Sequence, residues 1–71
     1  MTDEQNDKTR FELFRAIGAL QDAYAYALHA EQLARDAGAK GEAMRISALR
    51  QRINAATDHA AIIRDSVRHD A

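Results

Sequence analysis

The chain has 71 residues and contains no cysteine, proline or tryptophan. Without cysteine, neither a disulfide framework nor a thiolate metal site can supply stability. Without proline, no residue forces a break in a long helix. Only three glycines occur, at positions 18, 38 and 41. Stability must therefore come from noncovalent packing, and a chain of this length buries little surface on its own, so we expect a partner.

Long apolar runs are also missing. No run approaches the roughly 20 residues needed to cross a bilayer. The first seven residues include Asp3, Glu4 and Asp7 and no basic residue, unlike the start of a secretory signal. We therefore expect a soluble, cytoplasmic protein that does not associate with membranes.

What the chain does contain is two apolar patterns at helical spacing, over residues 13–37 and 46–67, separated by Gly38-Ala39-Lys40-Gly41. They predict an all-α fold: an antiparallel two-helix hairpin in residues 9–69, with helices at about 9–37 and 42–68 and a turn at 38–41. Thr9 and Glu12 have the spacing of a capping box, which predicts the helix start. Residues 1–8 form a polar segment that we expect to fray.

Read as heptads, each helix offers an apolar seam for the other. The predicted seam consists of Leu13, Ala16, Leu20, Ala23, Ala27, Ala30, Ala34 and Ala37 on the first helix, and of Ile46, Leu49, Ile53, Ala56, Ala60, Ile63 and Val67 on the second. Small residues face large ones in this pairing, as close packing requires. Beside the seam, we expect Glu31 near Arg50 and Tyr26 near Arg52.

A second stripe remains on the first helix once the seam is assigned. It consists of Phe11, Phe14, Ile17, Gln21, Tyr24 and Leu28. The combined apolar arc is too wide for one neighbouring helix. The stripe is symmetric about Gln21, which predicts a homodimeric four-helix bundle in which Phe14 packs on Leu28 of its mate. Aromatic residues are equally suited to bind another protein, so both uses of the stripe stay open.

The sequence offers little chemistry. Asp65 and His69 have the spacing of two metal ligands on one helix turn, but a bundle site needs several inward carboxylates and a Glu-x-x-His step, which are absent. No nucleophile, base and orienting group fall together, and we expect a two-helix hairpin to offer no concave pocket. We expect no metal, no cofactor and no enzymatic activity.

Nucleic acid is the alternative partner. The second helix carries arginines suited to phosphate contacts, at Arg45, Arg50, Arg52, Arg64 and Arg68. Acidic residues lie among them, including Glu42, Asp58 and Asp65, and no nucleic-acid-binding motif occurs. Up to Ala39 the chain has four Lys and Arg against seven Asp and Glu, and from Lys40 it has six against four. Opposite charges on the two halves are typical of helices that pair with each other.

The sequence thus favours a small non-enzymatic protein–protein interaction module. By analogy of size alone, such proteins are adaptors, assembly subunits or inhibitors that phages and other mobile elements direct at a host protein complex. The alternative is a dimeric RNA- or DNA-binding regulator that uses the arginines of the second helix.

Overall fold

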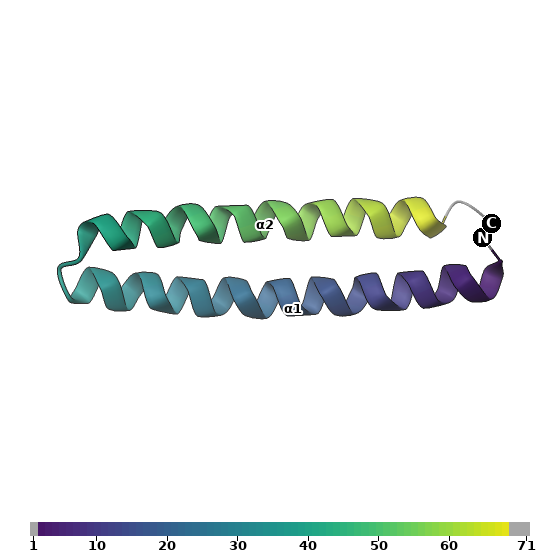
Figure 1. Cartoon of the computed structure of the whole chain (residues 1–71), viewed down its shortest axis with the longest axis horizontal. Helices are drawn as coiled ribbons and strands as arrows, with labels where there is room; N and C mark the ends of the chain where they lie inside the picture. Colours follow the sequence, from purple (N-terminus) through teal and green to yellow (C-terminus); the bar gives the residue numbers. More distant parts are fainter. Residues whose placement is uncertain (1, 69–71) are drawn as a thin grey trace.

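The computed structural model describes residues 2–68, with side chains through Val67, as two antiparallel α-helices joined by a short turn (Figure 1). Helix α1 spans Asp3–Asp36 and helix α2 spans Lys40–Arg68. The molecule is a rod of 53 × 14 × 10 Å. The predicted all-helical hairpin is confirmed. Neither described helix combines the length and apolar character that a membrane crossing needs.

Helix α1 begins well before the predicted start at Thr9. The Thr2 hydroxyl accepts a hydrogen bond from the Gln5 amide at 3.2 Å, and the Gln5 side-chain oxygen accepts one from the Thr2 amide at 3.0 Å. This capping box satisfies two amides that a helix start leaves unpaired. Acidic residues in the first turn favour the positive end of the helix dipole. The helix therefore runs through Thr9 without interruption.

The turn between the helices depends on Gly38, which has a φ of 77°. The Gly38 amide donates to the carbonyl of Arg35 at 3.0 Å, and the Ala39 amide donates to the carbonyl of Ala34 at 2.8 Å. These two bonds form a Schellman motif, which closes a helix with one left-handed residue. Helix α2 begins directly afterwards at Lys40, so the connection is shorter than the predicted 38–41 turn.

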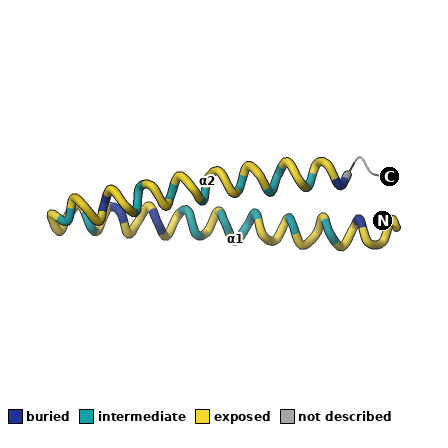
Figure 2. The backbone as a smooth tube through the Cα atoms, turned by 45° about the horizontal axis from the view of Figure 1, so that its top comes forward, coloured by how far each residue is buried: buried dark blue, intermediate teal, exposed yellow. Residues whose placement is uncertain are grey.

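The two helices face each other through a seam that the sequence predicts only in part. One predicted row on each helix is right, since its members are buried or half-buried: Leu13, Leu20, Ala27 and Ala34 on α1, and Ile46, Ile53, Ala60 and Val67 on α2 (Figure 2). The other predicted row is wrong, since most of its members are exposed: Ala16, Ala30, Ala37, Leu49, Ala56 and Ile63, with Ala23 half-buried. Buried or half-buried residues take that row's place: Ile17, Tyr24 and Glu31 on α1, and Arg50, Thr57 and Arg64 on α2.

The correction is the same on both helices. A second core row can follow the first by three residues or by four, because both steps stay on one helix face. The step of three gives purely apolar rows, whereas the step of four brings in Glu31, Arg50 and Arg64. The structure has the step of four, in which Glu31 and Arg50 pair with each other. On each helix the first row of the seam is therefore as predicted, and every member of the second row lies one residue later than predicted, which rotates the seam.

The resulting core is small. Within residues 2–68, the buried apolar residues are Ala27, Ala43 and Val67. Two polar residues, Asn6 and Glu31, are equally buried. Several large apolar side chains lie outside the seam, so the hairpin alone buries little of its apolar surface.

Candidate interaction surfaces

A polar cluster around Glu31 crosses the seam in the half of the hairpin nearer the turn. The side chain of Glu31 is 6% exposed. Its Oε1 accepts from Nε of Arg50 at 2.9 Å, and its Oε2 accepts from Nη2 of Arg35 at 2.7 Å. Nη1 of Arg50 also donates to the Tyr24 hydroxyl at 2.9 Å. Since Arg50 reaches two side chains of α1, this cluster fixes how the helices are aligned along their length.

The cluster favours the charged forms of Glu31 and Arg50. Hydrogen bonds from Arg35, and then from Arg50, hold the pKa of the Glu31 carboxyl below its ordinary value. The hydrogen bond to Glu31, followed by that to Tyr24, raises the pKa of the Arg50 guanidinium. The predicted proximity of Glu31 and Arg50 is confirmed. The ring beside an arginine is Tyr24, 5.5 Å from the Arg50 guanidinium carbon, whereas Tyr26 is 76% exposed.

The predicted aromatic stripe of α1 divides between the seam and the surface. Ile17 and Tyr24 are half-buried in the seam. The members that remain on the surface are Phe11, Phe14, Gln21 and Leu28. Helical spacing places the last three of these beside the seam, next to the equivalent positions of α2. We call this side of the rod the Phe14 edge: Phe14, Gln21 and Leu28 of α1 with Ser47, Asn54 and Ala61 of α2.

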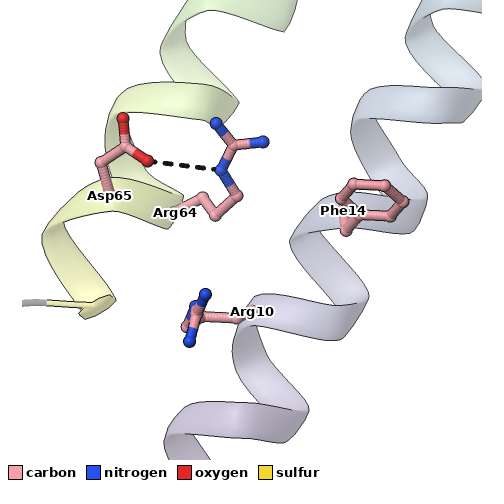
Figure 3. A pocket seen from close by; sticks show the side chains of 4 residues that line it. All are labelled: Arg10, Phe14, Arg64 and Asp65. Carbon is pink, nitrogen blue, oxygen red and sulfur yellow. Dashed lines mark hydrogen bonds and ion pairs between the residues drawn. The ribbon is translucent and has the colours of Figure 1, made fainter.

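A shallow pocket of about 280 Å³ opens beside Phe14 and is lined by Arg10, Arg64 and Asp65 as well (Figure 3). The two arginines extend from opposite helices toward the same space (Figure 3). Nε of Arg64 donates to Oδ1 of Asp65 at 3.4 Å. The pocket therefore combines an aromatic ring, two guanidinium groups and a carboxylate. Arg10 was not predicted from the sequence, although its spacing of seven residues before Ile17 marks it as a seam position.

A second pocket of about 360 Å³ lies near the turn, lined by Arg35, Lys40, Ala43 and Met44. Arg35 and Lys40 continue the same two helical rows as Phe14 and Ala61, so this pocket also belongs to the side of the Phe14 edge. Both pockets thus combine an apolar side chain with basic groups.

The opposite side of the rod has a different composition. We call it the Ala23 edge: Ala16, Ala23 and Ala30 of α1 with Leu49, Ala56 and Ile63 of α2. These are the residues that the sequence placed in the seam and that the structure places beside it. Leu49 is 52% exposed and Ile63 is 41% exposed. The Ala23 edge has no polar member, whereas Gln21, Ser47 and Asn54 interrupt the Phe14 edge.

The arginines of the nucleic-acid alternative do not form one surface. Arg50 is held in the seam by Glu31 and Tyr24, and its side chain is 21% exposed. Arg64 is paired with Asp65. Phosphate contacts by Arg50 would have to break its contacts with Glu31 and Tyr24, so Arg50 is poorly placed for such a role.

The remaining basic residues of that alternative are Arg45, Arg52 and Arg68. Arg45 and Arg52 are exposed on α2. The side chain of Arg68 lies outside the described residues. Two exposed arginines on one helix are a small electrostatic footprint for nucleic acid.

Metal-binding potential is limited over the part of the chain that the structure describes. No group of three or more His, Asp or Glu side chains in residues 2–68 is arranged to hold a metal ion. The pair that the sequence singled out, Asp65 and His69, cannot be assessed as a pair, since His69 lies outside the described residues.

Comparison of the chain with protein-family models, with curated protein sequences and with solved structures finds no match. Function must therefore be inferred from the surfaces themselves.

Proposed function

We propose that this chain is a non-enzymatic protein-interaction module that works as a homodimeric four-helix bundle and binds another protein through the Phe14 edge. The observation that supports binding is the exposure of two phenylalanines on one rigid helix, at 60% for Phe11 and 64% for Phe14. Aromatic residues dominate the energetics of protein interfaces, and exposed apolar patches mark interaction sites. Helix α1 fixes the backbone that carries these rings before a partner binds, so binding would not have to order this backbone.

The pocket beside Phe14 suggests the chemistry of the partner. Arg10 and Arg64 extend into the space next to the Phe14 ring (Figure 3). A partner segment that carries an apolar side chain and a nearby Asp or Glu would place the apolar group on Phe14 and the carboxylate between the guanidinium groups. Adaptors, assembly subunits and mobile-element inhibitors of a host protein complex all act through surfaces of this kind, and a cytoplasmic location fits each of them.

Affinity capture with two matched variants tests the proposal. The chain, immobilised through a tag, is used to capture proteins from its source cells in parallel with Phe14→Asp and Ile62→Asp. Phe14 and Ile62 are 64% and 65% exposed, so the substitutions are equal in kind and differ in location. We expect one captured protein that Phe14→Asp loses and Ile62→Asp retains. Direct titration of that purified protein should then show binding at least about 30-fold weaker with Phe14→Asp, the size of an interface hot spot.

Three outcomes would overturn the proposal: no protein captured above background, a protein captured equally well by Phe14→Asp, or a nucleic acid as the bound molecule. The last would point to the alternative regulator if binding survived about 200 mM salt and were abolished by charge reversal at Arg45 and Arg52.

A further inference from the structure

The hairpin exposes more surface than a folded chain of its mass should. Its accessible surface is 5453 Å² for 7.9 kDa, about 1,000 Å² more than the roughly 4,400 Å² of a typical folded monomer of that mass. The rod shape explains the excess, because one layer of two helices leaves both long sides open. A standard protein interface covers about 800 Å² on each partner. The excess is thus close to what one long interface along the rod would remove.

The Ala23 edge is the side whose composition suits such an interface. Arg50 contacts both Glu31 and Tyr24, which places it level with Ala27 between them. Because the helices are antiparallel, the next aligned pair is found seven residues later on one helix and seven residues earlier on the other. Along the rod, the residues of the Ala23 edge therefore form three side-by-side pairs, which we call levels. These are Ala30 beside Leu49, Ala23 beside Ala56, and Ala16 beside Ile63. The outer levels each pair a small residue with a large one, and the middle level has two small residues.

We infer that a second copy of this chain covers the Ala23 edge, with α1 of each copy lying on α2 of the other and both turns at the same end. This names the dimer interface of the proposed homodimer and rests on that proposal. In this arrangement Ala30 packs on Leu49 of the second copy, and Ala16 packs on Ile63 of the second copy. At the two outer levels a small residue meets a large one, as close packing favours. With the turns at opposite ends, Leu49 would meet Ile63 and the alanines would meet one another.

Charge favours the same arrangement. The chain up to Ala39 has four Lys and Arg against seven Asp and Glu, a net charge of −3, and from Lys40 it has six against four, a net charge of +2. Placing α1 on α2 of the second copy brings opposite charges together, whereas placing α1 on α1 would bring like charges together. Tyr26 and Arg52 border the edge on their respective helices, so Tyr26 comes to lie beside Arg52 of the second copy.

Molar mass in solution tests the interface. Light scattering of the untagged chain across a concentration series should give twice the 7.9 kDa chain mass. Ile63→Asp should weaken the dimer by more than about 100-fold, because each interface would bury two unpaired carboxylates. The matched control is Ile62→Asp, one residue away on the outer side of α2, which should leave the mass unchanged. Phe14→Asp should also remain dimeric.

Orientation is tested without touching the edge. The chain has no native cysteine, so a single spin label at Asp36→Cys, an exposed position at the end of α1, reports one distance between copies. Turns at the same end predict a distance far below the 53 Å length of the rod, and turns at opposite ends predict one close to it. A long distance would overturn the inference even if Ile63→Asp failed to fold.

Two further results would also overturn it. A wild-type chain that is monomeric at all concentrations would contradict the dimer interface. Partner binding through Phe14 would still be tested separately, by the capture experiment. A dimer that Phe14→Asp dissociates and Ile63→Asp does not would move self-association to the Phe14 edge.

Discussion

The two long sides of this rod are built from the same helical rows and differ in what fills them. The Ala23 edge is apolar along its length and has small side chains opposite large ones. The Phe14 edge has larger aromatic and aliphatic groups, but Gln21, Ser47 and Asn54 interrupt it, and basic residues line its pockets. A continuous, close-packing surface suits a permanent interface with an identical chain. An interrupted aromatic surface with charged pockets suits a specific and separable partner.

The difference shows how one short chain can serve two interfaces. Neither helix is strongly one-sided, and the seam between them takes only part of the apolar residues of each helix. The remainder is divided between two sides that cannot contact each other within one hairpin. In the two proposals above, self-association and partner binding are assigned to opposite sides of the molecule, so one would not exclude the other.

The largest of the remaining effects separates the seam from the Ala23 edge. Ala27 is buried between the helices, at 8% exposure, whereas Ala30 is exposed beside them. Ala27→Leu should overpack the seam and lower the free energy of unfolding by about 1–3 kcal/mol. Ala30→Leu should leave the helix pair intact and instead change the dimer affinity, since it faces Leu49 of the second copy. Thermal unfolding at several protein concentrations distinguishes the two, because only dimer stability depends on concentration.

Equal changes in stability from both substitutions at every protein concentration would contradict the placement of Ala27 in the seam and Ala30 outside it. That result would mean that both alanines lie in one seam, as the apolar heptad pattern predicted.

A smaller loss of stability is expected from a change in the turn, which joins the two helices that form both edges. Gly38 has a φ of 77° and no atom within 4 Å of an added Cβ, so Gly38→Ala introduces backbone strain without a clash. The cost should be about 1 kcal/mol, which lowers the melting temperature by roughly 4–8 °C in a domain of this size. Gly18→Ala is the matched control: it lies inside α1 with equal space around it and should stabilise the helix by about 1 kcal/mol. Two shifts of the same sign would contradict this account of the turn.

The last prediction concerns the Glu31 cluster and how the stability of the hairpin depends on pH in the acidic range. The pKa of Glu31 is held below its ordinary value of 4.5, so its contribution to stability is present above pH 4.5 and is lost as the pH falls through the lowered pKa. We expect the melting temperature to decline over that acidic range. Glu31→Gln should show a shallower decline.

The control for Glu31 is Glu12→Gln. The Glu12 carboxylate pairs with Arg15 on the surface, where its side chain is 67% exposed, and solvent screens such pairs. An acid profile that Glu12→Gln flattens as much as Glu31→Gln does would show that the seam cluster has no special role.

Much of the fold follows from the sequence, and the part that does not has a definite cause. Apolar periodicity and Gly38 were sufficient to predict two helices and the turn between them. Residues such as Leu20 and Ile53 were placed correctly because their row belongs to the seam under either heptad step. Tyr24 and Arg50 were not, because a rule that prefers apolar residues cannot anticipate charged groups that satisfy one another inside the seam. The start of α1 was missed because Thr9 gave a second capping signal nearer the apolar pattern.

The candidate surfaces could be predicted less fully for the same reason. Phe14 and Leu28 were identified because they fall outside either version of the seam. Ile17 and Tyr24 were grouped with them, although the rotated seam takes both away from the surface. The apolar character of Leu49 and Ile63 was plain in the sequence, but only the rotation shows that they are exposed. Arg10 was missed because it belongs to the seam only when the second row includes Ile17, seven residues after it.

Helix α1 starts and helix α2 ends at the same end of the rod, and the turn lies at the other (Figure 1). This layout gives the molecule a mechanical direction. A load applied between the two ends of the chain would separate the helices one layer at a time, and Glu31 and Arg50, which lie in the half nearer the turn, would be among the last pairs to part. A load applied between the turn and the chain ends would run along both helices at once and meet far greater resistance.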